Sequence, residues 1–292
     1  MGGVDIMIKL LALDLDGTLL DKGKYISKRN IDAILAAKQK GIEVVIATGR
    51  ANFDAQNLFK DFPFTPWIIG TNGATIHNPS GELFHSVPLE KSLAISMLKV
   101  LEENHLYYEA FIEGEICAPQ YGQKLLFEEI AQLKKTEPEI DLDHFQLEVE
   151  IQFGQSEFHF ISSYQKLVET NSEIYNILAY SFDEDKLKNG WSQFSDIPNI
   201  TIVQSGVHNF HLQHNQASKG NALTILARKL QIDLVDCAAV GDNYNDLSML
   251  EIAGLSAAMG NADKEIQEVC DFVTKSNNED GVAYFIEAFL KD

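Results

Sequence analysis

Two apolar runs near the start of the chain constrain the fold more than any other feature of the sequence. Residues 8–14 (IKLLALD) and 42–47 (IEVVIA) are almost continuously apolar, and the first run ends in a carboxylate. A central strand of a parallel sheet needs such a run, because both of its faces are buried. Residues 27–40 between them predict a helix that Ser27 caps and that ends before Gly41. The order strand, helix, strand predicts a parallel unit with a right-handed crossover.

A third strand is predicted near residues 67–69, which extends the alternation typical of a doubly wound parallel sheet. The pattern then changes, because residues 74–87 alternate around a turn and predict a hairpin. Mixed helices and strands follow to about residue 214. The alternation resumes with a predicted helix at 218–230 and an apolar strand at 235–240, followed by a helix from about Tyr244.

The sequence therefore predicts an α/β fold in two domains. The first is a doubly wound core that is split in the sequence, residues 1–85 and 215–292. The second is an inserted α+β domain, residues 86–214. A chain of 292 residues is long enough to bury two separate cores. We expect residues 1–6 (MGGVDI) to be an addition ahead of a natural start at Met7, and they take no part in this reasoning.

The charge balance limits the possible partners. The chain has 23 Lys and Arg against 43 Asp and Glu, for a net charge of −20. Such a surface repels nucleic-acid phosphates and anionic lipids, so we expect no nucleic-acid and no membrane partner. The apolar runs are too short to span a bilayer, and no secretory signal is recognised. Three cysteines without a CxxC pair favour a cytoplasmic location; the sequence does not indicate an oligomeric state.

Polar signatures stand where the predicted strands end. Residues 14–18 (DLDGT), 48–50 (TGR) and 241–246 (GDNYND) follow three strands, and Lys219 begins a helix. In open parallel sheets, ligands bind at the carboxyl ends of the strands. The carboxylates gathered there would repel one another unless they hold a divalent cation. Mg²⁺ prefers one or two carboxylates together with water and phosphate oxygens, and it would let an anionic substrate approach this acidic chain.

Two of these residues fit covalent chemistry on phosphorus. Asp14 is positioned as a carboxylate nucleophile that would form an aspartyl-phosphate. Gly17 allows a sharp turn, so that the carboxyl of Asp16 can reach the same site. There Asp16 would protonate the leaving oxygen and later take a proton from water.

The remaining polar residues fit binding roles. Thr48 and the amide of Gly49 can bond to phosphoryl oxygens, and Lys219 adds a compact positive charge. Asp242 would complete the metal ligands. Asp246 is expected to hold Lys219 or the waters of the metal.

Four segments resemble, in order, the motifs of haloacid dehalogenase (HAD) superfamily phosphatases of the Cof-type subfamily. They are DLDGTLL (14–20), ATGR (47–50), SKGNAL (218–223) and GDNYNDLSML (241–250), with further matches at TNGA (71–74), MGNA (259–262) and EDGVA (279–283). The approach to Lys219, HLQHNQ, departs from the pattern of relatives. The resemblance implies a Rossmann-like HAD core with an inserted cap domain that closes over the site and sets substrate specificity.

The same resemblance implies a ligand set. The metal would be bound by the side chain of Asp14, the main-chain carbonyl of Asp16 and the side chain of Asp242. Phosphate contacts would come from the following groups: the Leu15 amide, Thr48, Gly49, Lys219 and Asn245.

Taken together, these features predict a Mg²⁺-dependent phosphatase that hydrolyses small phosphorylated metabolites, with sugar phosphates the expected class, through an aspartyl-phosphate. Two alternatives remain open. A phosphomutase of the same fold would return the phosphoryl group to the substrate, and a non-catalytic sensor of phosphometabolites would keep the pocket without turnover.

The other polar residues have structural explanations. Arg50 is expected to pair with a carboxylate rather than to act in catalysis. His208, His211 and His214 could suggest zinc, but residues three apart on a strand point to opposite faces, so structural roles are expected. Neither acidic loop has the Gly and Glu positions of an EF-hand.

Overall fold

A computed structural model describes residues 7–154 and 157–289. The chain divides into two compact units. The first contains the chain up to residue 85 and again from residue 217, and the second contains residues 86–216. Each unit has its own sheet, and the two are described separately below.

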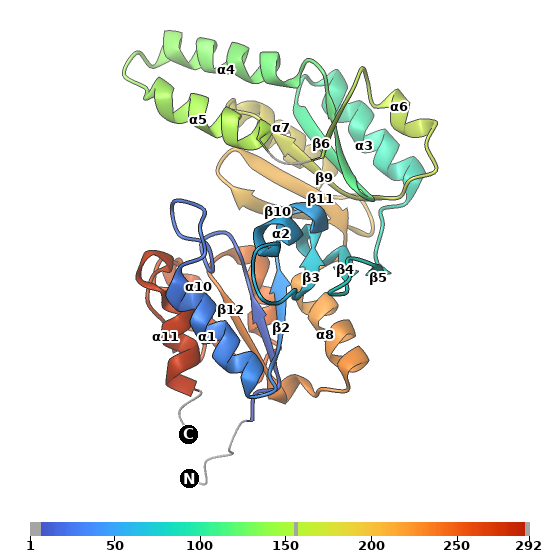
Figure 1. The fold of residues 1–292 in the computed structure, drawn as a ribbon. Coiled ribbons are helices and arrows are strands. Elements are labelled where there is room, and N and C mark those ends of the chain that lie inside the picture. Colours follow the sequence, from blue (N-terminus) through green and yellow to red (C-terminus); the bar gives the residue numbers. More distant parts are fainter. Residues whose placement is uncertain (1–6, 155–156, 290–292) are drawn as a thin grey trace. The chain divides into compact units, whose positions relative to one another are not determined.

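The first unit is built on an eight-stranded sheet in the order β14-β13-β12-β1-β2-β3-β4-β5 (Figure 1). Its strands are β1 (Leu10–Leu13), β2 (Glu43–Ala47), β3 (Trp67–Gly70), β4 (Thr75–His77), β5 (Leu83–Ser86), β12 (Cys237–Gly241), β13 (Leu255–Ala258) and β14 (Phe272–Val273). Every pairing from β14 to β3 is parallel, and β4 pairs antiparallel with β3. The predicted doubly wound parallel sheet is confirmed, and the predicted hairpin extends it at one edge.

Helices cover both faces of this sheet (Figure 1). One face packs against α1 (Lys28–Gln39), α2 (Asn52–Phe59) and α11 (Gly281–Phe289). The other packs against α8 (Lys219–Leu230), α9 (Leu247–Leu250) and α10 (Lys264–Val269). Along β1, Leu11 and Leu13 enter the first layer and Leu10 enters the second, so the run is apolar throughout because both sides are covered. As predicted, Ser27 caps α1, its hydroxyl accepting the Asn30 N–H at 3.1 Å.

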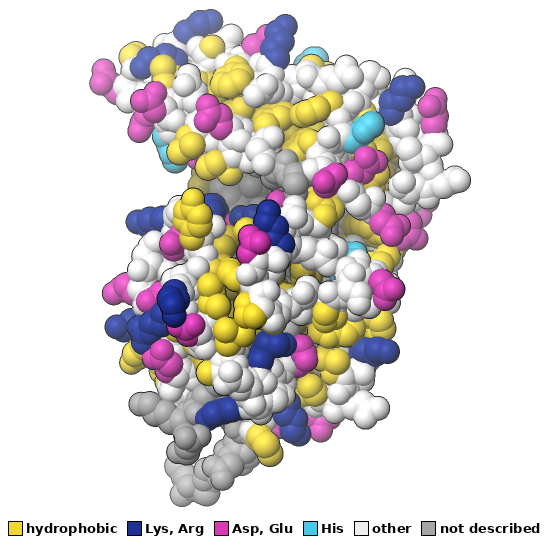
Figure 2. Space-filling model, in the orientation of Figure 1, with side chains coloured by type: hydrophobic (Ala, Val, Ile, Leu, Met, Phe, Trp, Pro, Cys, Tyr) yellow, Lys and Arg dark blue, Asp and Glu magenta, His cyan; other side chains and the backbone are white. Residues whose placement is uncertain are grey.

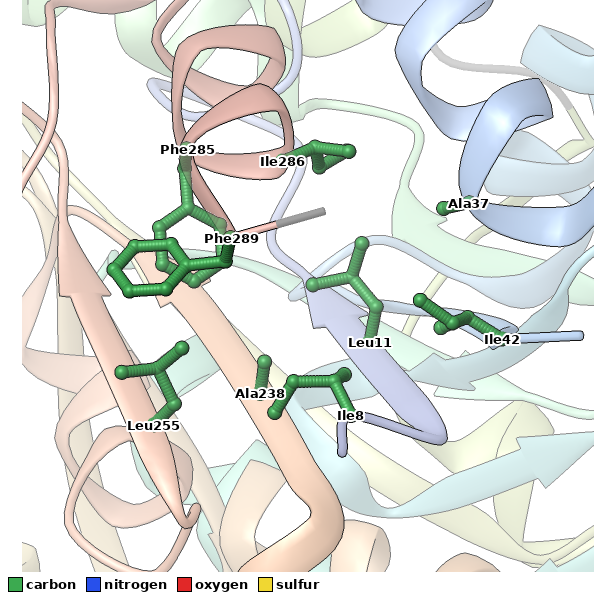
Figure 3. Close-up of a pocket in the computed structure, with 9 residues that line it drawn as sticks. All are labelled: Ile8, Leu11, Ala37, Ile42, Ala238, Leu255, Phe285, Ile286 and Phe289. Carbon is green, nitrogen blue, oxygen red and sulfur yellow. The ribbon is translucent and has the colours of Figure 1, made fainter. Parts of the chain in front are cut away.

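The first layer is closely packed (Figure 3). Side chains of α11, with Phe285 and Ile286 among them, point toward Leu11 on β1 and Ala238 on β12. The void between them is about 20 Å³, and every residue that lines it is apolar. A space of this size without polar partners does not hold an ordered water, so it is a packing defect rather than a ligand site.

Two expectations near the end of the chain were wrong. The strand predicted at 235–240 begins only at Cys237, because Leu234–Asp236 (η2) forms a 3₁₀ turn in which Val235 is exposed. The helix predicted from Tyr244 is instead a 3₁₀ turn, Tyr244–Asp246 (η3), followed by the single turn of α9. The cause is local: the Asp246 carboxylate turns back to accept backbone N–H groups just before the turn.

The second unit has a six-stranded sheet in the order β10-β11-β9-β6-β7-β8. Its strands are β6 (Tyr107–Ile112), β7 (Glu115–Pro119), β8 (Phe158–Ile161), β9 (Ile174–Tyr180), β10 (Ile200–Gly206) and β11 (Asn209–His214). Its helices are α3 (Lys91–Glu103), α4 (Gly122–Thr136), α5 (Leu142–Phe153), α6 (Gln165–Val168) and α7 (Glu184–Phe194). The core lies between one face of this sheet and helices that include α3 and α7, an α+β arrangement.

The three histidines have separate surroundings in this unit. His208 precedes β11, whereas His211 and His214 lie three residues apart on it. His211 is buried and bonds to Asn176 Oδ1 and Ser205 Oγ, both at 2.9 Å. Burial lowers the pKa of His211 to about 4, so the ring is neutral at pH 7. His211 is therefore part of a hydrogen-bond network inside the unit.

The surface carries charge of both signs. Figure 2 shows acidic and basic side chains interspersed over the face in view, with hydrophobic side chains between them. Among the residues that the structure describes, no helix has the length and apolar character needed to cross a bilayer.

Candidate active site

A buried lysine joins two carboxylates at the carboxyl edge of the parallel sheet. Lys219 Nζ lies 2.7 Å from Asp14 Oδ1 and 2.5 Å from Asp246 Oδ1. The side chains of Lys219 and Asp246 are fully buried, and that of Asp14 is 7% exposed. Asp14 directly follows β1, and Lys219 is the first residue of α8, which Ser218 caps. Residues 205 positions apart in the chain thus meet in a single ion-pair cluster.

Asp242 belongs to the same cluster. It follows β12, the strand that pairs in parallel with β1. Its Oδ1 accepts the hydroxyl of Thr18 at 2.7 Å. Gly17 has a φ of +85°, and a Cβ at that position would lie 2.3 Å from Asp242 Oδ2. The turn after β1 therefore needs glycine for its conformation and for this close approach.

The electrostatics of the cluster reflect three carboxylates around a single ammonium. Burial raises the pKa of Asp14 well above its usual value, and the carboxylates of Asp246 and Asp242 add to this effect while Lys219 opposes it. Burial also raises the pKa of Asp242, to about 6. For Lys219, burial acts to lower the pKa, but Asp14 and Asp246 outweigh it, so the ammonium stays charged.

The donor set fits a hard divalent cation. Asp14, Asp242 and Asp246 each offer an oxygen, and these atoms lie within 4.8 Å of one another. Both oxygens of Asp246 already accept hydrogen bonds, Oδ1 from Lys219 and Oδ2 from the N–H groups of Asp242 and Asn243 at 3.0 Å. Asp14 and Asp242 are thus the side chains best placed to serve as ligands. Three buried or half-buried carboxylates face the single ammonium of Lys219, so a cation such as Mg²⁺ bound here would balance the remaining negative charge.

Asp16 has different partners from the cluster. Its Oδ2 accepts Arg50 Nε at 2.6 Å, and its Oδ1 accepts Arg50 Nη2 at 2.8 Å and Lys24 Nζ at 2.7 Å. Burial would raise the pKa of Asp16, but the two cations outweigh it and hold the pKa below the usual range. Arg50 also bonds to Asp54 Oδ2 at 2.9 Å, so it is paired with carboxylates as the sequence suggested.

The residues predicted to bind phosphate lie on loops at this same edge. Thr48 directly follows β2, is 1% exposed, and its hydroxyl accepts the Arg50 N–H at 3.1 Å. Asn245 lies in η3, next to Asp246. The side chain of Leu15 is buried in the core, so only its backbone is available for a ligand. These loops meet because β12, β1 and β2 are neighbouring parallel strands.

Two residues at this edge were not singled out from the sequence. Thr18 donates to Asp242, and its position four residues after Asp14 in the first motif was an available signal. Asn72 accepts a hydrogen bond from Asn245 Nδ2 at 3.0 Å. Asn72 lies in the TNGA match, where the resemblance gave no role to the individual residues.

The fold and site together define a doubly wound α/β core with an acidic centre bridged by Lys219, and comparisons with known proteins identify the family. The family described as haloacid dehalogenase-like hydrolase matches residues 11–286. Phosphatase YwpJ of Bacillus subtilis (strain 168) is 44% identical over 285 residues, which cover 97% of this chain and 100% of that protein. The 5-amino-6-(5-phospho-D-ribitylamino)uracil phosphatase YwtE of the same organism is 37% identical over 283 residues, covering 97% of this chain and 98% of that protein.

A solved structure of a haloacid dehalogenase-like hydrolase from B. subtilis gives a TM-score of 0.85 at 43% identity, and the match covers 97% of this chain and 100% of that chain. The chain therefore belongs to the haloacid dehalogenase-like hydrolase family. The resemblance drawn from its motifs is confirmed.

Proposed function

We propose that this chain is a Mg²⁺-dependent phosphatase of small phosphorylated metabolites that acts through an aspartyl-phosphate. The observation that carries the proposal is the pairing of the buried Asp14 carboxylate with Lys219 beside Asp242. Relatives that align over nearly the whole chain are named phosphatases. The substrate named for one of them carries its phosphate on a ribityl chain, which supports a phosphorylated sugar or sugar alcohol as the substrate class.

Asp14 is the nucleophile in this proposal. One of its carboxylate oxygens attacks phosphorus, the bond from phosphorus to the ester oxygen breaks, and the leaving oxygen takes a proton from Asp16. Water then attacks the aspartyl-phosphate, gives a proton to Asp16 and releases inorganic phosphate. Lys219 stabilises the negative charge of Asp14 and of the phosphoryl oxygens throughout.

The contacts of Asp16 add a requirement to this sequence of steps. Arg50 and Lys24 hold its carboxylate ionised in the structure, and an ionised carboxylate cannot donate a proton. Asp16 must therefore take up a proton and leave Arg50 before it acts as the acid. We propose that an arriving phosphoryl group competes for Arg50 and so releases Asp16.

The metal would be held by the side chains of Asp14 and Asp242 and by the main-chain carbonyl of Asp16. Bound there, Mg²⁺ would supply positive charge next to the phosphoryl oxygens.

We further propose that residues 86–216 act as the cap that sets substrate selectivity, since they are inserted between the second and third motifs. A cytoplasmic location is supported by the three cysteines, all of which are free thiols.

The variant Asp14→Asn tests the nucleophile with p-nitrophenyl phosphate as substrate and Mg²⁺ present. The carboxamide cannot form the aspartyl-phosphate, so turnover should be abolished while circular dichroism stays that of the folded protein. Asp61→Asn is the matched control, because Asp61 is an exposed residue of the same unit, and it should keep full activity. Full activity of Asp14→Asn would contradict the proposed mechanism.

Two further measurements separate the alternatives. Incubation with a hexose phosphate should release inorganic phosphate, whereas a phosphomutase would return an isomeric hexose phosphate. Chelation with EDTA followed by Mg²⁺ titration should remove and then restore activity. A sensor without turnover would show no product under either condition.

A further inference from the structure

The turn that follows β3 contacts the backbone of both the second motif (47–50) and the third motif (218–223). Within it, the N–H of Asn72 donates to the carbonyl oxygen of Thr48 at 3.0 Å. Gly73 packs against the backbone at the start of α8, since a Cβ on Gly73 would lie 2.2 Å from the carbonyl oxygen of Ser218. The turn Thr71–Gly73 (η1) is thus fixed to Thr48 on one side and to the residue before Lys219 on the other.

The backbone of this turn is strained. Thr71, Asn72 and Gly73 have φ values of +53°, +55° and +95°, so three consecutive residues adopt the left-handed region. Glycine and asparagine accept this conformation readily, but it is costly for a β-branched threonine. Strain of this kind persists where the surrounding structure enforces it, often at functional sites.

The side chain of Asn72 is held between two groups that are predicted to bind phosphate. Its Oδ1 accepts Asn245 Nδ2 at 3.0 Å. A Cβ built on Gly49 would lie 3.1 Å from Asn72 Oδ1 and 3.6 Å from Asn72 Nδ2, so the amide lies directly against Gly49. Asn72 is 2% exposed, yet its Nδ2 has no hydrogen-bond partner among the residues that the structure describes.

A buried amide donor without an acceptor is unusual, because most buried polar atoms in folded proteins are hydrogen-bonded. Here the unpaired Nδ2 donor lies beside Gly49 and in the side chain that Asn245 contacts, and both of these residues are predicted to bind a phosphoryl group. We propose that Asn72 is a further substrate-binding residue: its Nδ2 donates to a phosphoryl oxygen while its Oδ1 fixes the orientation of Asn245. This inference rests on the proposed phosphatase function and adds to it a residue that accounts for the strained turn.

Two substitutions test the donor in different ways. Asn72→Asp keeps the shape and an oxygen that can accept from Asn245, but it replaces the donor with an oxygen that repels phosphate. Asn72→Gly removes the amide and fits the left-handed backbone without strain. Asn199→Asp is the matched control, because Asn199 is an exposed asparagine of the other unit with a φ of +63°, so the same change of residue and charge is made in the same backbone conformation.

The probe is inorganic phosphate, measured as an inhibitor of p-nitrophenyl phosphate hydrolysis and as a ligand that raises the midpoint of thermal unfolding. Loss of a hydrogen bond to a charged group should weaken phosphate binding by about ten-fold or more in both Asn72 variants. The Asn199 variant should bind phosphate like the unaltered protein. A variant that is only destabilised would unfold at a lower temperature but would gain the usual increase in midpoint from phosphate.

The outcomes also separate this inference from the function on which it rests. If the unaltered protein hydrolyses the aryl phosphate and both Asn72 variants bind phosphate normally, the role of Asn72 is refuted and the phosphatase remains. If the unaltered protein binds phosphate but does not turn over, the proposed function fails, while the phosphate-dependent midpoints still decide the role of Asn72. Should Asn72→Asp not fold, Asn72→Gly decides alone.

Discussion

Replacing Lys219 with methionine should remove a major electrostatic contribution to the stability of the first unit. The ammonium is fully buried and lies 2.7 Å from Asp14 Oδ1 and 2.5 Å from Asp246 Oδ1. Methionine keeps much of the volume of the side chain but leaves both carboxylates without their counter-charge. Removing one partner from a buried ion pair costs about 3–5 kcal/mol in the free energy of unfolding, and we expect a loss of that size at pH 7.5.

The loss should shrink as the pH falls. Without Lys219, the folded-state pKa of Asp14 rises further above that of the unfolded chain, because the opposing positive charge is gone. A folded state that binds more protons than the unfolded state gains stability as the pH decreases. The difference between variant and unaltered protein should therefore be smaller at pH 5.5 than at pH 7.5.

Urea denaturation in EDTA measures this effect in a Trp191→Phe background, where Trp67 on β3 is the remaining tryptophan and reports on the first unit. Asp246→Asn removes one of the carboxylates, so the double variant should lose less than the sum of the single losses, by about 1–3 kcal/mol. Lys28→Met is the control, because its ion pair with Asp32 is exposed and should contribute little. If Lys219→Met unfolds at the same urea concentration as this control, the buried ion-pair cluster is refuted.

Two further predictions concern other parts of the chain. The second unit should lose about 2 kcal/mol of unfolding free energy as the pH falls from 7.5 to 5.0, because the pKa of His211, about 4, lies below the usual 6.5 and only the unfolded chain takes up the proton. His211→Gln should make the unfolding free energy less dependent on pH, as measured in denaturation curves followed by Trp191 fluorescence. Gly17→Ala and Gly41→Ala should each lower the free energy of unfolding by about 1–2 kcal/mol, because both positions have positive φ. Only Gly17→Ala forces Asp242 to move, so it alone should raise the Mg²⁺ concentration for half-maximal activity by about ten-fold or more. An equal Mg²⁺ requirement in the two variants would contradict this geometry.

Much of the first unit could be predicted because its signals are local. The run at Leu10–Leu13 is apolar at every position, and Ser27 caps the next helix with its own hydroxyl. One departure arose where a side chain from a neighbouring position competes for the backbone N–H groups. That side chain is Asp246, because its carboxylate accepts backbone N–H groups near Asp242 and shortens the expected helix to a 3₁₀ turn.

The candidate active site also has a part that the sequence predicts and a part that only the fold shows. Asp14, Lys219 and Asp242 could be nominated from the sequence, since parallel strands that end in polar residues bring those residues to one edge of a sheet. The contact between Lys219 and Asp246 was among those expected, but the remaining contacts could not be predicted, because a carboxylate has several rotamers and the choice among them depends on every charge nearby. Asp16 illustrates this limit: the sequence places it two residues from Asp14, and only the folded chain shows that Arg50 holds it.

The sequence alone determined the family, the order of strands and helices in the core and the residue types that gather at its edge, because these follow from periodicity, capping and spacing along the chain. Only the tertiary structure decided which charges neutralise one another and which donor is left without an acceptor. Such pairings depend on distances of a few ångströms between segments that are far apart in the chain, as Asn72 and Asn245 are. No local pattern encodes those distances.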